Sequence, residues 1–293
     1  MSETTYSVAV IIPTLNAENE IERLIHLLKK QTYPIQRIIV VDSSSDDNTQ
    51  ALCNALDIQL VNVKREDFDH GKTRDLALRR CNEDIVVFMT QDALPANDRL
   101  IEKLLIPFDD EDVAAVSARQ LPKPDATAME SYVREFNYPD QSQIRTNKDI
   151  PELGIKTYFS SDVCAAYRKD IYEKLGGFEY PILTNEDMLF AAKAIRAGYK
   201  VAYQADAEVY HSHNLSLAEQ YKRNYIQGYE LERHKALLGN VSQNEEGWKL
   251  VAYVTKKLLA KGRLISFIHF GFDCLARFLG SKMGKRAYQK GKL

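Results

Sequence analysis

The sequence predicts an α/β protein with a doubly wound, mostly parallel sheet. Short apolar runs alternate with segments of helical periodicity between residues 8 and 89, which is the order expected of parallel strands joined by helices. Two of these runs stop on a carboxylate, Asp42 and Asp92, and ligands bind at that edge of an open α/β sheet. A third carboxylate, Asp187, precedes a segment of helical character. We therefore expect three carboxylates at one crevice, which suits a nucleotide, a metal ion and a proton to be removed.

Each element follows from its local pattern. Apolar runs bounded by polar loops predict strands at 8–14, 37–41, 60–63, 85–89, 113–118, 160–167, 200–203 and 207–210. Spacings of three and four residues, as in Ile21, Leu24, Ile25 and Leu28, predict helices. The expected helices are 18–31, one opened by 43–49, 70–81, one before residue 113, 170–175, 186–197 and most of the chain from 216 on. Residues 126–159 show only weak periodicity.

The composition is that of an ordinary globular protein, with 45% apolar and 27% charged residues. The four cysteines are far apart and form no Cys-x-x-Cys pair, so zinc and thiol redox motifs are absent. Residues 1–5 lack the basic region of a signal peptide, and no stretch reaches the roughly 18 apolar residues that span a bilayer. A cytoplasmic location is therefore expected. No Gly-x-Gly-x-x-Gly follows the first strand, which argues against a Rossmann dehydrogenase.

The C-terminal segment differs from the rest of the chain in charge. Residues 249–293 hold eleven basic side chains and one acidic one, in a chain of net charge −2. Between residues 264 and 279 a broad apolar helical face lies opposite a polar one, and Phe270 falls off this pattern. A helix of this kind with basic flanks is typical of segments that lie on an anionic membrane surface. Packing on the rest of the chain or on a second subunit would give the same periodicity, so a homo-oligomer stays open.

Several motifs, in order, resemble family 2 glycosyltransferases with the GT-A fold. They are Ile12-Pro13-Thr14-Leu15-Asn16, Val-Val-Asp-Ser-Ser-Ser-Asp-Asp-Asn-Thr at 40–49, Thr-Gln-Asp-Ala at 90–93, and Gly176-Gly177-Phe178 followed by Asn185-Glu186-Asp187. With Asp-His-Gly-Lys-Thr-Arg at 69–74, they are similar to bacterial rhamnosyltransferases of polysaccharide synthesis. The resemblance covers residues 8–214. It implies a GT-A catalytic domain at 1–215, with a nucleotide-sugar half at about 1–110 and an acceptor half at about 111–215, and a helical, basic, amphipathic extension at 216–293.

A nucleotide-sugar pocket is expected at the ends of the first strands. Asp42 would accept hydrogen bonds from a base or a ribose, and its alternative role is to cap the next loop. The helix that opens at His70 would offer Gly71 for close backbone approach and Arg74 for a phosphate, where the family has an arginine near the nucleotide, while Lys72 could equally be solvated. The other expected nucleotide contacts are Pro13, Thr14, Asn16, Ser44 and Gln91.

Asp92 is the expected metal ligand, because a divalent cation such as Mg²⁺ or Mn²⁺ takes oxygen ligands and bridges the oxygens of a diphosphate. The family's usual Asp-x-Asp is Thr90-Gln91-Asp92 in this chain, so one carboxylate is missing. The resemblance implies a histidine that completes the metal site, and His211 matches that position; a core histidine is the alternative. Alternation along a strand would turn His213 to the same face.

Asp187 is the expected catalytic base of an inverting transfer, which needs a carboxylate within hydrogen-bond reach of the acceptor hydroxyl. Glu186 is the alternative base or an acceptor contact, and both residues could also simply cap the following helix. Lys222, Arg223 and His213 are candidates for contacts to the acceptor or to the departing diphosphate. A solvated helix face is the alternative for the two cations.

The resemblance implies transfer of L-rhamnose from dTDP-β-L-rhamnose to a lipid-linked or oligosaccharide acceptor in cell-surface polysaccharide synthesis. The expected location is the inner face of the cell membrane, as a peripheral protein, with no nucleic acid as partner. Two rival interpretations stay open. One is a transferase with a UDP-hexose donor. The other is a nucleotide-binding scaffold with a degenerate site, which the missing carboxylate at Thr90 makes conceivable.

Overall fold

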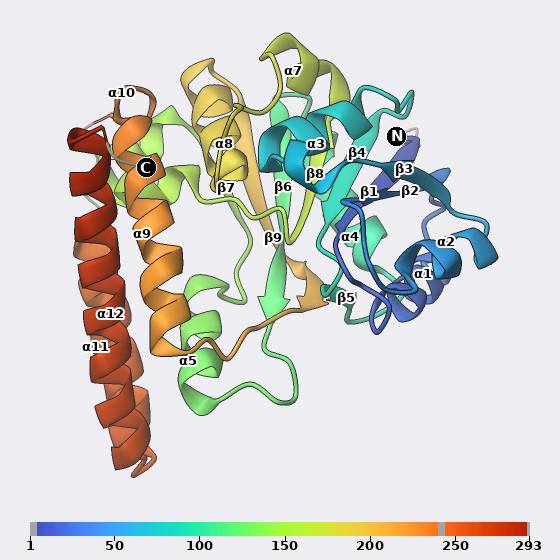
Figure 1. Cartoon of the computed structure of the whole chain (residues 1–293). Helices are drawn as coiled ribbons and strands as arrows, with labels where there is room; N and C mark the ends of the chain where they lie inside the picture. Colours follow the sequence, from blue (N-terminus) through green and yellow to red (C-terminus); the bar gives the residue numbers. More distant parts are fainter. Residues whose placement is uncertain (1–4, 240–243, 292–293) are drawn as a thin grey trace.

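One mixed sheet forms the centre of the computed structural model, which describes residues 5–239 and 244–291 (Figure 1). Its strands are β1 (Val8–Thr14), β2 (Arg37–Asp42), β3 (Gln59–Asn62), β4 (Ile85–Met89), β5 (Leu94–Pro95), β6 (Val113–Leu121), β7 (Gln143–Arg145), β8 (Cys164–Arg168) and β9 (Lys200–Tyr210). They are ordered β3-β2-β1-β4-β8-β6-β9-β5, and the short β7 pairs with β9. The apolar runs that predicted β1 and β4 are buried because helices cover both faces of the sheet.

The predicted parallel arrangement is confirmed for the first four strands. β1 pairs in parallel with β2 and with β4, and β2 pairs in parallel with β3. β8 then inserts antiparallel between β4 and β6, and β6 pairs in parallel with β9. β1, β2, β4, β6 and β9 consequently point the same way, and their C-terminal ends lie along one edge of the sheet.

Helices cover the sheet and bury an apolar core on each face. The helices are α1 (Ile21–Lys29), α2 (Thr49–Ala55), α3 (His70–Leu78), α4 (Leu100–Leu105), α5 (Ala128–Asn137), α6 (Ile150–Leu153), α7 (Lys169–Lys174), α8 (Glu186–Arg196), α9 (Leu217–Arg233), α10 (Lys235–Leu238), α11 (Asn244–Ala260) and α12 (Leu264–Gln289). α1 and α4 share one core with Val10 and Val40, and α3 and α8 share the other with Ile11 and Ile39. Successive side chains of a strand therefore pack into the cores on opposite faces of the sheet, because side chains alternate between the two faces.

Three parts of the sequence-based assignment differ from the structure. The strand expected at 160–167 begins only at Cys164. The strands expected at 200–203 and 207–210 are one strand, β9, in which a shift of register opposite β6 accompanies an outward-facing Asp206. The weakly periodic segment 126–159 contains α5, β7 and α6. The sequence did not predict α5, because its buried face includes the charged side chains Glu130 and Arg134, which interrupt the helical spacing of apolar residues.

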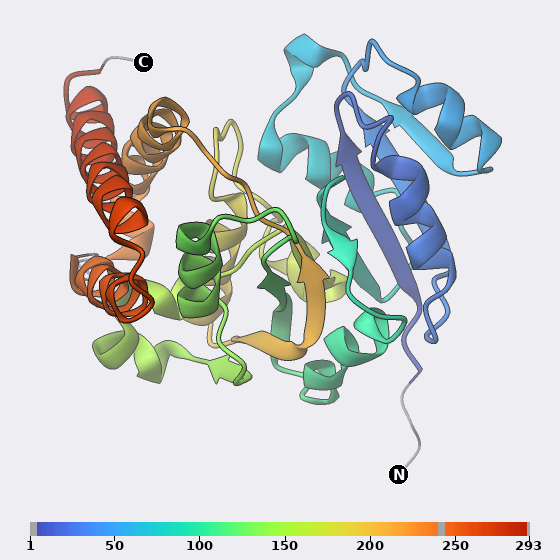
Figure 2. The ribbon, with the colours of Figure 1, turned by 90° about the horizontal axis from the view of Figure 1, so that it is seen from below.

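α9 and α12 run side by side at the flank of the molecule that is remote from β3 (Figures 1 and 2). Their backbones touch at glycines of α12. A Cβ added at Gly280 would clash with the Tyr221 carbonyl, and one at Gly284 would clash with the Tyr225 carbonyl. The two contacts advance together along both helices, so α9 and α12 are parallel.

α5, α11 and the first half of α12 enclose a small apolar core of their own, which includes Val133, Val254 and Phe270. Phe270 departs from the expected outward pattern because it faces this core. The broad apolar face points away from the protein, and more than half of each of its main side chains is exposed: Leu264, Ile265, Ile268, Phe272, Leu275 and Phe278. By length and composition α12 could cross a membrane, so the expectation that no segment is long and apolar enough is wrong.

Candidate active site

A cavity of about 510 Å³ opens where the C-terminal ends of β1, β2 and β4 meet. Its lining consists of Pro13, Thr14, Leu15, Glu20, Ser43, Arg65, Phe68, His70, Arg74, Thr90, Gln91, Asp92 and His213. The wall is therefore partly apolar and partly charged. A volume of this order with a few polar groups is typical of small-molecule sites, which usually enclose roughly 300–1,000 Å³.

Six predicted site residues are in this lining: Pro13, Thr14, Arg74, Gln91, Asp92 and His213. Gln91 ties the loop after β4 to the loop after β1. Its side-chain oxygen accepts from the Leu15 N–H at 2.9 Å, and its side-chain nitrogen donates to the Leu15 carbonyl at 3.2 Å. The two bonds hold both loops, and with them the apolar Leu15, at the mouth of the cavity.

Asp42 is fully buried behind this wall. Its carboxylate accepts hydrogen bonds from Thr14 Oγ1 at 3.1 Å, from the Ser45 N–H at 2.9 Å and from Gln50 Nε2 at 2.7 Å. These bonds cap the loop after β2, which was the alternative to a direct nucleotide contact. Asp42 reaches the cavity through Thr14, whose side chain it orients.

Three predicted nucleotide contacts are not among the lining residues of the cavity: Asn16, Ser44 and Gly71. They shape the backbone around it. Asn16 and Ser44 adopt the left-handed backbone conformation, with φ of 53° and 60°, in the turns after β1 and β2. Gly71 is buried, and a Cβ there would clash with the Glu179 carbonyl. Gly71 therefore permits close packing of α3 against the loop at Glu179.

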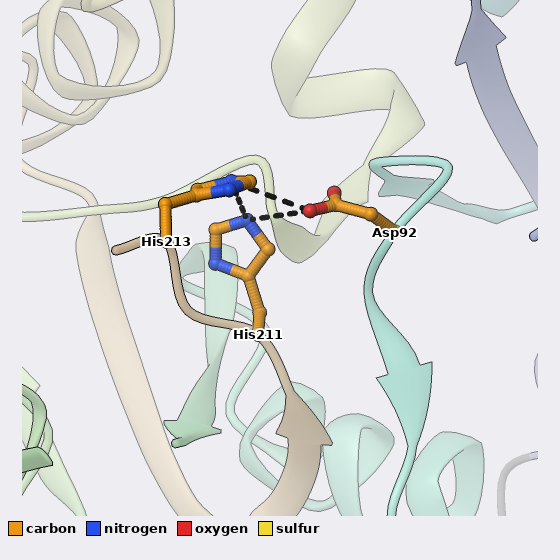
Figure 3. A group of neighbouring side chains, drawn as sticks. All are labelled: Asp92, His211 and His213. Atoms are coloured by element: carbon orange, nitrogen blue, oxygen red, sulfur yellow. Dashed lines mark hydrogen bonds and ion pairs between the residues drawn. The ribbon is translucent and has the colours of Figure 1, made fainter. Parts of the chain in front are cut away.

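Asp92, His211 and His213 converge at the same edge of the sheet (Figure 3). The two histidines turn to the same side, as expected, but they lie in an irregular segment after β9 and not on a strand. His211 Nε2 and His213 Nε2 are 3.1 Å apart, and they lie 3.5 Å and 3.3 Å from Asp92 Oδ2. Lys123 Nζ contacts the same Asp92 oxygen at 3.3 Å.

This donor set fits a divalent transition metal. Metal–ligand bonds of about 2.1 Å place neighbouring donor atoms roughly 3.0–3.5 Å apart, as in this cluster. Two imidazole nitrogens and one carboxylate oxygen suit a transition metal better than Mg²⁺, which prefers oxygen. Burial lowers the pKa of His211 to about 3, against the opposing effect of Asp92, so its imidazole is neutral at neutral pH and keeps one nitrogen free to bind a metal. The Thr90 hydroxyl, which lines the same cavity as Asp92, is buried and has no hydrogen-bond partner among the described residues, so it is free to accept or donate a bond to a bound group.

Arg74 joins the cavity to a group of buried carboxylates. Its guanidinium lies 3.3 Å from Asp162 Oδ2 and 3.2 Å from Glu186 Oε1, and all three side chains are almost fully buried. It also donates to the His70 carbonyl at 3.1 Å. Because its charge is shared between two carboxylates, Arg74 is held in place at the cavity wall.

Glu186 and Asp187 both begin α8 but have different surroundings. Glu186 is paired with Arg74, whereas the half-buried Asp187 accepts from the Asp162 N–H at 3.0 Å and from the Met188 N–H at 2.6 Å. Burial, together with the charge of Glu186, raises the pKa of Asp187 to about 7. A carboxylate with a pKa near neutrality is suited to accept a proton at physiological pH. Both residues lie beside the cavity lining, and Arg74 connects them to it.

Lys222 and Arg223 are exposed on the first turns of α9. Arg223 lies near His213: burial lowers the pKa of His213, and nearby cations that include Arg223 add to this effect. Arg223 is therefore the better placed of the two for a contact at the site. Lys222 matches the alternative of a solvated helix face.

Comparison with known proteins identifies the family. The profile described as "Glycosyl transferase family 2" matches residues 9–176, which include twelve of the cavity's thirteen lining residues. This chain belongs to glycosyltransferase family 2. This family 2 glycosyltransferase is 42% identical over 223 residues to the O-antigen chain rhamnosyltransferase RfbN of Salmonella typhimurium, covering 75% of this chain and 71% of that protein. It is 41% identical over 224 residues to the O-antigen chain rhamnosyltransferase WbaN of Salmonella anatum, covering 76% and 71%.

The GT-A fold predicted for this family 2 glycosyltransferase is confirmed by solved structures. The mannosyltransferase PcManGT from Pyrobaculum calidifontis, solved with GDP-Man and Mn²⁺, has a TM-score of 0.65 at 18% identity, over 98% of this chain and 88% of that one. TarS residues 1–349 from S. aureus, solved with UDP-GlcNAc, has a TM-score of 0.55 at 18% identity, over 98% and 92%. Likeness at this level of identity shows the fold alone.

Sequence reasoning missed several residues at the site of this glycosyltransferase. Arg65 and Phe68 line the cavity, Lys123 contacts Asp92, and Asp162 contacts Arg74. Asp162 did carry a signal, because it directly precedes the apolar run that contains β8. Arg65 begins a single 3-10 turn and Lys123 lies in the loop after β6, and spacing along the sequence does not indicate which residues such segments bring together.

Proposed function

We propose that this enzyme is an inverting rhamnosyltransferase that moves L-rhamnose from dTDP-β-L-rhamnose onto a glycan acceptor in cell-surface polysaccharide synthesis. The observation that carries the proposal is the 42% identity to an O-antigen chain rhamnosyltransferase over 75% of the chain. The cavity, the cluster at Asp92 and the raised pKa of Asp187 support it, because the transfer needs a donor pocket, a cation site and a base.

The donor would occupy the cavity with its diphosphate toward Asp92. Pro13, Leu15 and Phe68 offer apolar surface for the base. Lys123 and Arg223 add positive charge on the side of the histidines, where charge accumulates as the diphosphate departs. Arg74 is already engaged by two carboxylates, so we expect it to order the cavity wall and the base rather than to neutralise phosphate.

Asp92, His211 and His213 would hold Mn²⁺ in preference to Mg²⁺, because two of the three donors are imidazole nitrogens. The bound cation would neutralise negative charge on the diphosphate oxygens as the bond to the sugar breaks. The presence of Mn²⁺ beside GDP-Man in PcManGT, which shares the fold, is consistent with this assignment.

Asp187 would take the proton of the acceptor hydroxyl while that oxygen attacks the anomeric carbon from the face opposite the leaving dTDP. A single displacement of this kind converts the β-linked donor sugar into an α-linked product. Glu186 is the poorer base because Arg74, at 3.2 Å, holds it in a fixed ion pair. Asp187 keeps partial exposure and a pKa of about 7, which allow it to meet the acceptor and to be ionised part of the time at neutral pH.

We also propose that the enzyme works as a peripheral protein at an anionic membrane surface on the cytoplasmic side, where a lipid-linked acceptor would be within reach. The support is α12, whose exposed apolar face points away from the protein. Exposed basic side chains lie at both ends of this face: Lys256, Lys261, Arg263, Lys282, Lys285 and Arg286. An apolar face flanked by cations is suited to the boundary between lipid headgroups and acyl chains.

Calorimetric titration of the purified protein with dTDP, UDP and GDP, each with Mn²⁺ or Mg²⁺, tests the donor assignment. We expect the tightest binding for dTDP with Mn²⁺, followed by turnover of dTDP-β-L-rhamnose when an acceptor glycan is supplied. A preference for UDP, with turnover of a UDP-hexose, would overturn the donor while leaving family and fold unchanged. Nucleotide binding without turnover of any sugar nucleotide would favour the nucleotide-binding scaffold with a degenerate site, and absence of binding for all three nucleotides would overturn the donor pocket itself.

A further inference from the structure

The side chain of Gln120 lies directly behind His211. Gln120 is the penultimate residue of β6 and is 2% exposed. Its Oε1 lies 3.0 Å from His211 Nδ1 and also accepts a hydrogen bond from Arg134 Nη1. Its Nε2 donates to Ser161 Oγ at 2.9 Å. All polar atoms of this amide therefore have partners, and one partner is a histidine of the cluster at Asp92.

The hydrogen bond from Arg134 determines the orientation of the Gln120 side-chain amide. A guanidinium can only donate hydrogen bonds, so the amide atom that faces it must be the oxygen. The same oxygen faces His211 and can only accept, so His211 Nδ1 must carry the proton. His211 Nε2 is then left with its lone pair, on the side of the ring that faces Asp92 and His213.

Arg134 is itself fixed in place. It lies on α5 and pairs with Glu130 one helical turn earlier, at 2.7 Å, and both side chains are almost fully buried. Among the described residues Arg134 pairs with one carboxylate, so its guanidinium retains N–H donors for other acceptors, and Gln120 accepts from one of them. The hydrogen bonds thus run without a break from Glu130 through Arg134 and Gln120 to His211.

We propose that Gln120 is a positioning residue that fixes His211 in its Nδ1–H tautomer and aims the Nε2 lone pair at a cation held with Asp92 and His213. The proposal deepens the function proposed above and rests on its cation site, but not on the donor sugar or the acceptor. Outer partners of this kind orient metal-binding histidines, and their loss typically weakens metal affinity by about 10–100-fold.

The test uses the full chain labelled with ¹⁵N-histidine, without metal and at about pH 8, where the imidazoles are neutral. The ¹⁵N and ring-proton shifts report which nitrogen of each of the six histidines carries the proton, and a His211→Gln variant assigns the signals of His211. We expect His211 to be protonated at Nδ1. Protonation at Nε2 in the wild-type protein would overturn the proposal without any further variant.

The variant Gln120→Met removes the amide at similar volume, and Gln120→Glu keeps an acceptor for Arg134 and His211. We expect Gln120→Met to mix the two tautomers and to weaken binding of Mn²⁺ alone, measured by paramagnetic resonance of the free ion, by about 10–100-fold. Gln120→Glu should retain the Nδ1–H tautomer. Gln204→Met is the matched control, because Gln204 is another buried glutamine whose side chain bonds Ser142 instead.

Equal Mn²⁺ affinity in Gln120→Met and the wild type would contradict the proposal, as would a wild type that binds no Mn²⁺. Failure of the donor assignment is a separate result. An enzyme that prefers UDP, or that transfers a sugar other than rhamnose, would show the same tautomer and the same dependence of Mn²⁺ binding on Gln120.

Discussion

Asp187 and Glu186 are adjacent in sequence, yet their surroundings assign them different chemistry. Arg74 holds Glu186 in a buried ion pair, while Asp187 has two backbone N–H donors and a pKa raised by burial and by Glu186. The sequence placed both carboxylates at the start of a helix and favoured Asp187 as the base with Glu186 as the alternative, but it gave no reason in their surroundings for that preference. The choice depends on Arg74, which is brought to α8 from α3 by the packing of both helices on one face of the sheet.

Asp187→Asn tests the base. We expect a loss of transfer rate of about 10²–10⁴-fold, and in the wild type a rate that rises with pH and levels off above about 7. A steady-state pH profile with donor and acceptor measures both. A variant that keeps the wild-type rate, or a profile that is flat between pH 5 and 9 (roughly the range in which a perturbed carboxylate titrates), would contradict the assignment.

Asp187→Asn should lower the transfer rate but raise the stability of the folded protein relative to the wild type as pH increases. Because the folded-state pKa of Asp187 is raised to about 7, the folded protein holds a proton there that the unfolded chain has already lost. The wild type therefore loses stability as pH rises from about 4 to about 7, and the permanently neutral Asn does not. We expect the thermal midpoint of Asp187→Asn, relative to wild type, to increase over this range. A constant difference between the two proteins would contradict the raised pKa.

Arg74→Met tests the carboxylate group behind the cavity. Removal of the guanidinium leaves Asp162 and Glu186 buried without their cation, and breaking a buried pair costs about 3–5 kcal/mol of unfolding free energy. Urea denaturation measures this loss. Arg99→Met is the control, because the side chains of Arg99 and of its partner Glu102 are both exposed to solvent, and such a pair should contribute little to stability. Similar losses in both variants would argue against a special role for Arg74.

Single residues were predictable where a strand delivers them and unpredictable where loops bring them together. Asp92 lies in the turn three residues after β4 ends at Met89, so its place at the sheet edge followed from the apolar run before it. Asp42 was placed at the same edge by the same rule, but the rule does not show that Thr14, Ser45 and Gln50 take up its oxygens. The contact of Lys123 with Asp92 depends on the path of the loop after β6, which no periodicity encodes.

At the level of elements, the parallel packing of α9 and α12 depends on the absence of side chains at Gly280 and Gly284. Gly284→Ala would press a methyl group onto the Tyr225 carbonyl, which we expect to lower the free energy of unfolding by about 1–3 kcal/mol. Gly271→Ala is the matched control on the same helix. A Cβ there meets nothing, so the substitution should stabilise by roughly 0.5–1 kcal/mol. Changes of the same sign in urea denaturation would show that backbone contact does not hold the two helices together.

Elements of the first half of the sheet were predicted well because each strand and helix carries its own period. The second half resisted prediction for a topological reason. β8 comes late in the sequence but lies between β4 and β6, antiparallel to both, and such an insertion leaves no mark on a pattern of alternating strands and helices. The expected boundary near residue 110, between the nucleotide-sugar half and the acceptor half, does not correspond to a break in the sheet. The sheet continues from β4 through β8 into β6.

For the whole molecule, the exposed face of α12 predicts attachment to anionic vesicles. We expect the full chain to sediment with vesicles that contain phosphatidylglycerol and to remain in solution with phosphatidylcholine alone, since the flanking cations attract anionic lipid. Ile265→Glu/Ile268→Glu should abolish sedimentation. Ile106→Glu/Ile144→Glu is the matched control, because these side chains are also exposed but lie far from α12 in the sequence.

A different outcome would assign the face of α12 to another occupant. If Ile265→Glu/Ile268→Glu leaves vesicle binding unchanged but converts a dimer to a monomer in size-exclusion chromatography, the face is a contact between two copies of the chain. The expected result is the reverse: loss of vesicle binding with no change in oligomeric state.

The place of β8 in the sheet also has a consequence for synthesis of the chain on the ribosome. β4 is buried along its whole length in the finished fold, and one of its two edges pairs with β8. While the chain is being made, β4 emerges well before Cys164–Arg168 does. An apolar strand with an open edge is a template for pairing with other chains. The nascent protein therefore passes through a stage in which shielding by a chaperone would matter most, and that stage ends only when β8 arrives.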